Sequence, residues 1–200
     1  MGQTPPPENS EAPDDPTHYT FRQSPAGAPS EFILGETEIE WRSGLRSLKI
    51  PYREIRQVRL VYRPVTLQNY RFVAEVKSRI GIKFTIASTS WRSLVEHERH
   101  DRFYMAFLTE LHRRLAAAGG DVAYLRGAPA FLYWPGLLIF TVLMLATAAL
   151  AVRTVQSGEW QSSLFIAAML GFFLWQTATF FRRNKPGVYA PDRLPAELLP

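Results

Sequence analysis

The chain has 200 residues, of which 46% are hydrophobic and 20% are charged, so it is long enough for one or two domains and too apolar to be disordered throughout. Lysine and arginine exceed aspartate and glutamate by 23 to 18, and the net charge of +5 is compatible with an anionic partner such as nucleic acid or a phospholipid surface. The chain has no cysteine, which excludes disulfides, thiolate nucleophiles and Cys-ligated zinc.

The N-terminal 30 residues are rich in proline and acidic residues and carry a net charge of −3. Such a composition buries too little apolar surface to offset the entropy of ordering, so we expect residues 1–16 to form a disordered tail. The tail is either a spacer or a proline-rich ligand for a cytoplasmic domain. We expect no signal peptide, because the first residues have neither its basic segment nor its apolar segment.

Apolar residues then recur at every second position, the pattern of strands with one buried face. In the run EIEWR, for example, Ile39 and Trp41 alternate with charged residues. The same alternation predicts strands around residues 18–22, 32–34, 48–50, 58–63, 71–77 and 80–87. A series of six or seven short strands with short connections is typical of a small antiparallel β-barrel or sandwich.

After Trp91 the pattern changes to that of an amphipathic helix. Its apolar stripe has spacings of three and four and consists of Phe103, Tyr104, Phe107, Leu108, Leu111 and Leu115. Gly119 and Gly120 end the helix, and we expect His112 to be an exposed polar position. The fold expected for residues 17–118 is therefore α+β, with a small β-domain followed by one C-terminal helix.

His97 and His100 invite comparison with zinc-binding HExxH helices. Their i, i+3 spacing, in place of i, i+4, and the lack of a third ligand at a fixed spacing argue against a metal site. We expect residues 97–101 to form the solvated N-terminus of the helix. The sequence has no Walker loop, nucleophile elbow or dinucleotide-binding fingerprint. We therefore expect no enzymatic activity, no metal and no cofactor.

Two long segments without an ionisable side chain follow the helix. As helices, residues 131–152 would extend about 33 Å and residues 163–181 about 28 Å, and a hydrocarbon core is about 30 Å thick. A pair of buried core helices is the alternative, but the remaining chain is too short to cover two helices that are apolar on every side. We predict a transmembrane hairpin with a linker before it (119–130), a short loop at 153–162, and a Pro-rich tail after it (182–200).

Basic residues flank the predicted hairpin unevenly. Arg126, Arg182, Arg183 and Lys185 lie at the end near the β-domain, whereas the loop has a single arginine. The positive-inside rule then places both termini in the cytoplasm and the loop in the periplasm. A basic residue near the surface is attracted to anionic lipid by about 1 kcal/mol, so these four residues are candidates for contact with anionic lipid.

The β-domain carries most of the positive charge, because residues 31–126 have 17 basic and 11 acidic side chains and a net charge of +6. A candidate interaction face consists of basic residues on outward strand faces or in adjoining turns: Arg56, Arg59, Arg63, Arg71, Lys77, Arg79 and Lys83. The alternative is an ordinary solvated strand surface. Binding of nucleic acid would rest on this charge alone, and we do not expect it.

The run KIPYREIRQVRLVYR, residues 49–63, resembles a known family. Its Ile50-Pro51-Tyr52 step at the end of a strand, followed by Ile55 and Val58, is similar to the bacterial pleckstrin-homology-like (PH-like) domains of small membrane proteins. The resemblance covers approximately residues 30–118 and implies a PH-like fold and a location in the bacterial cytoplasmic (inner) membrane. In familiar members the membrane hairpin precedes the domain, whereas here it follows.

These features favour a membrane-tethered cytoplasmic interaction or assembly module without catalytic activity. Its expected partners are the lipid bilayer and other membrane proteins or further copies of the chain. The alternative is an accessory subunit of a membrane transport or channel complex, with Gln176 and Thr179 lining a path. The lack of charged residues within the spans argues against a pore.

Overall fold

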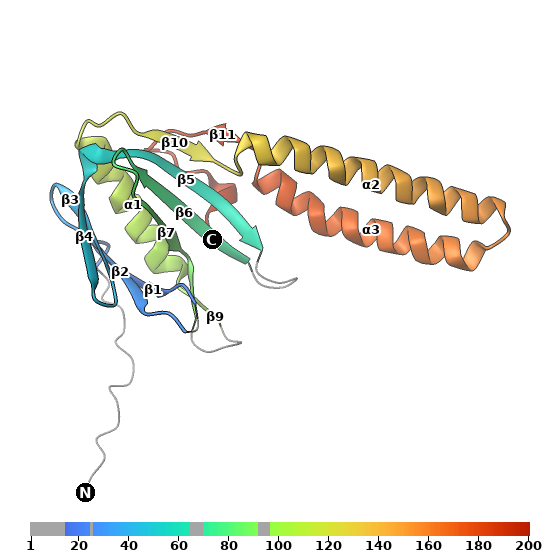
Figure 1. The fold of residues 1–200 in the computed structure, drawn as a ribbon, viewed down its shortest axis with the longest axis horizontal. Helices are drawn as coiled ribbons and strands as arrows, with labels where there is room; N and C mark the ends of the chain where they lie inside the picture. Colours follow the sequence, from blue (N-terminus) through green and yellow to red (C-terminus); the bar gives the residue numbers. More distant parts are fainter. Residues whose placement is uncertain (1–14, 25, 65–69, 92–96) are drawn as a thin grey trace, which may run out of the picture.

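The computed structural model describes residues 15–24, 26–64, 70–91 and 97–200. The expected disordered tail, residues 1–16, lies almost wholly outside them. Figure 1 shows an α+β domain from which two long helices project side by side. The α+β class, with strands preceding the helices, is therefore confirmed.

The first sheet is an antiparallel meander in the order β1-β2-β3-β4. Its strands are β1 (His18–Arg22), β2 (Pro29–Leu34), β3 (Glu38–Ser43) and β4 (Arg46–Pro51). The period-two alternation places Tyr19, Phe21, Phe32 and Ile39 on one face, where all four side chains are buried. Charged residues such as Glu40 lie on the other face.

The second sheet has the order β11-β10-β5-β6-β7. Its strands are β5 (Ile55–Pro64), β6 (Tyr70–Ser78), β7 (Lys83–Ala87), β10 (Ala123–Arg126) and β11 (Gly187–Val188). A separate hairpin pairs β8 (Thr89–Trp91) with β9 (His97–Arg99). Within the described residues no strand pair joins the two main sheets, so the domain is not the closed barrel that was one of the two expectations.

The Ile50-Pro51-Tyr52 step forms the corner between the two sheets. Pro51 ends β4, and the chain turns through a short 3-10 helix, η1 (Tyr52–Glu54), before β5 begins. The Tyr52 side chain is buried at the corner, where its hydroxyl donates a hydrogen bond of 2.8 Å to the carbonyl oxygen of Gly35. This motif therefore has a structural role in separating β4 from β5.

Helix α1 (Asp101–Ala117) covers the core with the apolar stripe expected from the sequence. The Phe107 ring lies 5.5 Å from that of Tyr19, centroid to centroid, so the helix packs on the first sheet through aromatic contacts. The expectation for residues 97–101 was wrong, because residues 97–99 form β9 and the helix begins at Asp101. Three residues are too few for periodicity to reveal a strand.

Helices α2 (Ala130–Gln156) and α3 (Trp160–Arg183) form an antiparallel hairpin. Both are long and apolar enough to cross a membrane, and the most apolar 18-residue window of each has no buried residue. Gly158, with φ of 82°, turns the chain between them. Near this turn the hydroxyls of Thr154 and Ser163 are 2.6 Å apart. The loop is residues 157–159, shorter than the expected 153–162, because both helices extend into it.

The segments on either side of the hairpin belong to the folded domain. The expected linker, residues 119–130, contains β10, and the expected tail, residues 182–200, contains β11 and a 3-10 turn, η2 (Ala196–Leu198). Leu198 is only 1% exposed and belongs to the hydrophobic core. The chain therefore leaves and re-enters the same sheet around the hairpin.

His112 is buried, contrary to the expectation that it is exposed. Its Nδ1 lies 2.7 Å from the carbonyl oxygen of Leu108, and its Nε2 lies 2.8 Å from the hydroxyl of Tyr189 in the C-terminal segment. The histidine occupies the buried side of α1 because the C-terminal segment covers a part of the helix that the helical pattern alone leaves open. Burial lowers the pKa of His112 to about 4.

The lowered pKa predicts acid sensitivity of the fold. In the unfolded chain His112 takes up a proton near pH 6.5, whereas in the folded chain it does so only near pH 4. The contribution of neutral His112 to the free energy of unfolding is therefore fully present above pH 7 and is lost as the pH falls from 6.5 to 4. We expect the free energy of unfolding to decrease by about 2 kcal/mol from pH 7 to pH 5.

Chemical denaturation of the full chain in neutral detergent measures this decrease. His112→Gln should remove the difference between pH 7 and pH 5, whatever its absolute stability. An unchanged pH dependence in this variant would contradict the assignment to His112.

Candidate functional site at the base of the hairpin

Strand β5 is the element to which the hairpin is attached. Strand β10 pairs in parallel with β5 as far as Arg126 opposite Leu60. The Gly127 N–H then donates a last hydrogen bond of 2.8 Å to the Leu60 carbonyl oxygen, and α2 begins at Ala130. Since β5 continues to Pro64, its final residues lose β10 as a neighbour.

The Asn184 side chain replaces β10 at this edge. Its Oδ1 accepts a hydrogen bond of 3.1 Å from the Tyr62 N–H, and its Nδ2 donates one of 2.8 Å to the Tyr62 carbonyl oxygen. Asn184 follows directly after α3 and is 0% exposed. A carboxamide presents the same donor and acceptor as a peptide group. The Asn184 side chain therefore continues the hydrogen bonding along the edge of β5 beyond the last residue that pairs with β10.

The two chain segments that enter and leave the hairpin also touch each other. The Ala128 N–H donates to the Asn184 carbonyl oxygen at 2.9 Å. Gly127 has φ of 72°, and a Cβ there would overlap the carbonyl oxygens of Asn184 and Lys185. Only glycine permits both this left-handed conformation and this close approach.

Aromatic contacts surround the hydrogen bonds. The Arg183 guanidinium lies 5.0 Å from the centre of the Tyr62 ring and 5.7 Å from that of Phe72. Within the hairpin, the Tyr133 hydroxyl donates to the Phe181 carbonyl oxygen at 3.2 Å. At the base of the hairpin, α3 therefore contacts both the sheet and α2.

The four basic residues proposed for lipid contact all lie at this base. Arg126 is half-buried and forms an ion pair of 3.0 Å with Glu197, and Arg183 packs on the aromatic rings described above. Arg182 and Lys185 are exposed at the end of α3. Arg126 and Arg183 both contact Glu197 of the C-terminal segment, whereas Arg182 and Lys185 are exposed.

Five of the seven residues of the candidate interaction face share the outer face of the β5-β6-β7 sheet. They are Arg59, Arg63, Arg71, Lys77 and Lys83. Arg56 lies at a register irregularity between Ile55 and Gln57 and is outside this set. Arg79 follows the end of β6 and donates to the Asp121 carbonyl oxygen at 3.2 Å. The structure thus brings together most of this group.

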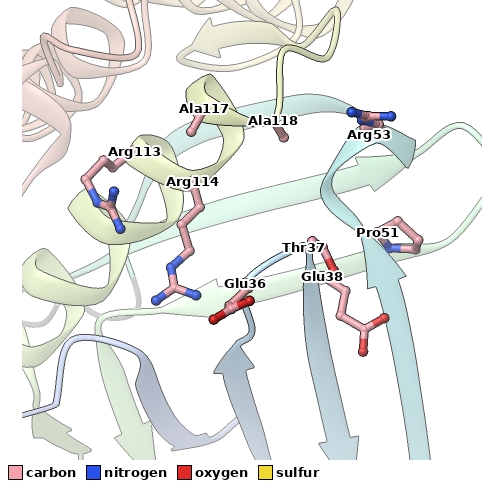
Figure 2. Close-up of a pocket in the computed structure, with 9 residues that line it drawn as sticks. All are labelled: Glu36, Thr37, Glu38, Pro51, Arg53, Arg113, Arg114, Ala117 and Ala118. Carbon is pink, nitrogen blue, oxygen red and sulfur yellow. The ribbon is translucent and has the colours of Figure 1, made fainter.

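A groove of about 710 Å³ lies at the C-terminal end of α1, and no sequence pattern predicted it. Figure 2 shows Arg114 extending from the helix toward Glu36, with Glu38, Pro51 and Arg53 on the opposite side. Arg114 donates to Glu110 and to the carbonyl oxygens of Leu34 and Gly35. Its hydrogen bonds hold α1 to the turn before β3, which gives Arg114 a structural role.

The described residues contain no group of three or more potential metal ligands. No family model, no curated protein and no solved structure matches the chain. The function must therefore be argued from the geometry of the hairpin base and the charged face beside it.

Sequence reasoning identified the basic residues at the hairpin base but missed Asn184, Gly127 and Glu197. An Asn immediately after a long apolar segment, with a proline two positions later, is a recognisable helix end. Nothing in the linear pattern relates residue 184 to residue 62, because the contact joins segments 122 positions apart.

The Asn184 pairing predicts a large effect of truncation. Asn184→Ala leaves the buried N–H and carbonyl of Tyr62 unpaired, and each such group costs about 1–3 kcal/mol. We expect the free energy of unfolding to fall by about 2–5 kcal/mol, together with faster hydrogen exchange of the Tyr62 amide. Lys185→Ala, at the exposed neighbouring position, is the control. Equal stabilities of the two variants would contradict the role of Asn184.

Gly127 provides a second test of the close approach. Gly119 has a similar φ of 67°, but no atom lies within 4 Å of the position that a Cβ would occupy there, so Gly119→Ala measures the backbone strain alone, about 1 kcal/mol. Gly127→Ala adds the overlap with two carbonyl oxygens and should lower the melting temperature considerably more. Equal melting temperatures would show that the junction is loose enough to absorb a methyl group.

Proposed function

We propose that the chain is a non-enzymatic interaction or assembly module with a PH-like domain on the cytoplasmic face of the bacterial inner membrane. The observation that carries this proposal is the attachment of the domain to the hairpin through β10, Asn184 and β11. A domain attached in this way presents its faces at a fixed orientation to the membrane, which favours a partner that is itself in the membrane.

Membrane insertion is supported by the surface of the hairpin. Large apolar side chains are exposed along both helices, including Leu145, Phe165 and Trp175. Soluble proteins rarely expose a patch of this extent, which favours its burial in a bilayer or against other membrane helices. Two basic residues exposed at the base, Arg182 and Lys185, support the cytoplasmic side for the domain.

The PH-like assignment is supported by the order of elements. The resemblance implies six or seven short strands followed by a single helix, and in the chain a series of short antiparallel strands likewise precedes helix α1. Strands β10 and β11 extend this arrangement at the β5 edge. They are the additions that attach the hairpin.

Partners of the proposed module are other membrane proteins or further copies of the chain. In the alternative, an accessory subunit of a transport or channel complex, the partner binds the hairpin and not the domain. The two proposals therefore differ in which surface is covered in the cell.

Site-specific photo-cross-linking in native membranes distinguishes the two surfaces. The photoreactive residue replaces Leu45 or Ile80, both exposed on the domain, or Leu145 or Trp175, both exposed on the hairpin. We expect discrete cross-linked products from the domain positions, because the domain is the part held at a fixed orientation. Products from the hairpin positions alone would favour the accessory subunit, and no product from any position would contradict both.

Topology reporters at Ser157 and at the C-terminus accompany this experiment. We expect Ser157 in the periplasm and the C-terminus in the cytoplasm. A periplasmic C-terminus would contradict the proposed orientation of the domain.

A further inference from the structure

The outer face of the β5-β6-β7 sheet holds three arginines around one carboxylate. Arg59 lies opposite Glu75, and Arg63 lies opposite Arg71 in the register of β5 and β6. Like charges in directly opposed positions destabilise a strand pair. A nearby anion would therefore stabilise the Arg63–Arg71 pair.

Glu75 supplies this anion to Arg63, and its charge also acts on Arg59 opposite it. The Arg63 guanidinium forms an ion pair with Glu75, which lies two register pairs away along the sheet. The intervening pair on this face is Val61 and Val73, which are only 8% and 1% exposed. The Arg63 side chain thus reaches along the face to Glu75 while it stays next to Arg71, and Glu75, the carboxylate among the described residues on this part of the face, is already in an ion pair.

Arg71 is left without a counter-ion among the described residues. Its Nε is buried and has no hydrogen-bond partner in that part of the chain. Burial lowers the pKa of Arg71, and the neighbouring Arg63 lowers it further. A partly desolvated guanidinium without a carboxylate is an unfavourable arrangement unless a ligand completes it.

The arginine pair lies at the level of the hairpin base. Tyr62 is hydrogen-bonded to Asn184, the first residue after α3, and Arg63 is the next residue along β5. In Figure 1 the paired ends of β5 and β6 reach the end of the domain from which the hairpin projects. This is the depth at which the headgroups of a spanned bilayer lie.

We propose that Arg63 and Arg71 bind the phosphate of an anionic phospholipid in the membrane that the hairpin spans. The proposal rests on the proposed function only for the membrane insertion of the hairpin. A phosphate group accepts the parallel N–H donors of a guanidinium, and its charge relieves the repulsion between the two arginines. Arg182 and Lys185, exposed at the end of α3, add positive charge on the same side of the membrane.

The position of the pair favours a lipid over an acidic protein. A soluble acidic partner could bind equally well to Lys77 and Lys83, which also lie directly opposite each other on this face. These lysines are at the other end of β6, away from Tyr62 and the hairpin base. They provide a matched control with the same change in charge.

Native mass spectrometry of the full chain in neutral detergent tests the site. Short-chain phosphatidylglycerol, short-chain phosphatidylcholine, inorganic phosphate and an acidic peptide are added in separate experiments. We expect preferential retention of phosphatidylglycerol by the wild-type chain. The double variant Arg63→Gln/Arg71→Gln should weaken this retention about tenfold or more, and Lys77→Gln/Lys83→Gln should weaken it less than about threefold.

A second measurement keeps the test independent of folding. Without lipid, Arg71→Gln should be at least as resistant to thermal unfolding as the wild-type chain, because it removes the repulsion with Arg63. Equal loss of retention in the two double variants would overturn the proposal, as would binding of the peptide or of phosphate but not of phosphatidylglycerol. The topology reporters and cross-links are repeated in Arg63→Gln/Arg71→Gln. If they stay unchanged, the proposed function stands whether or not the lipid site does, so the two failures can be told apart.

Discussion

Strand β5 extends beyond the point where its neighbour β10 ends. The backbone groups of Tyr62 on this edge are buried and must still be hydrogen-bonded, since a buried peptide group without a partner is strongly unfavourable. The chain meets this requirement with the side chain of Asn184, whose carboxamide pairs with both backbone groups of Tyr62. Because Asn184 directly follows α3, the sheet is complete only when the hairpin has returned to the domain. Folding of the domain and closure of the hairpin therefore depend on the same contact.

This constraint explains the arrangement of the surrounding residues. Gly127 lacks a side chain where the outgoing segment passes the carbonyl oxygens of the returning one. Beyond this point, β11 pairs with β10, and Tyr189 meets buried His112. The C-terminal segment is thus part of the core of the domain, and the hairpin is an insertion between two strands of one sheet. Because the insertion is held at both ends, the orientation of α2 and α3 is fixed relative to the domain.

The sequence predicted the elements whose pattern is long and regular. The structure confirms a strand at Glu38–Ser43, the amphipathic helix α1 and two long apolar helices in the uncharged segments. Strands β10 and β11 were missed, because four and two residues are too few to show a period. Both form through pairing with distant segments, β10 with β5 and β11 with β10. His112 was wrongly predicted to be exposed, because its burial depends on a contact with Tyr189, which is 77 residues away in the sequence. Of the site, the charges were predictable from composition. The position of Arg71 opposite Arg63 depends on strand register, and the diagonal ion pair of Arg63 with Glu75 depends on side-chain conformation, neither of which a linear pattern shows.

The attachment of the hairpin to the sheet is the central claim, and a distance between the two parts tests it most directly. The chain has no cysteine, so Leu45→Cys in the β3–β4 turn and Ser157→Cys in the hairpin loop provide two unique sites for spin labels. Pulsed electron–electron double resonance on the full chain in a bilayer then reports the distribution of distances between them. The account predicts a single narrow distribution that broadens in Asn184→Ala. A broad distribution in the doubly labelled chain with Asn184 intact would contradict it, because the domain would then move freely relative to α2 and α3.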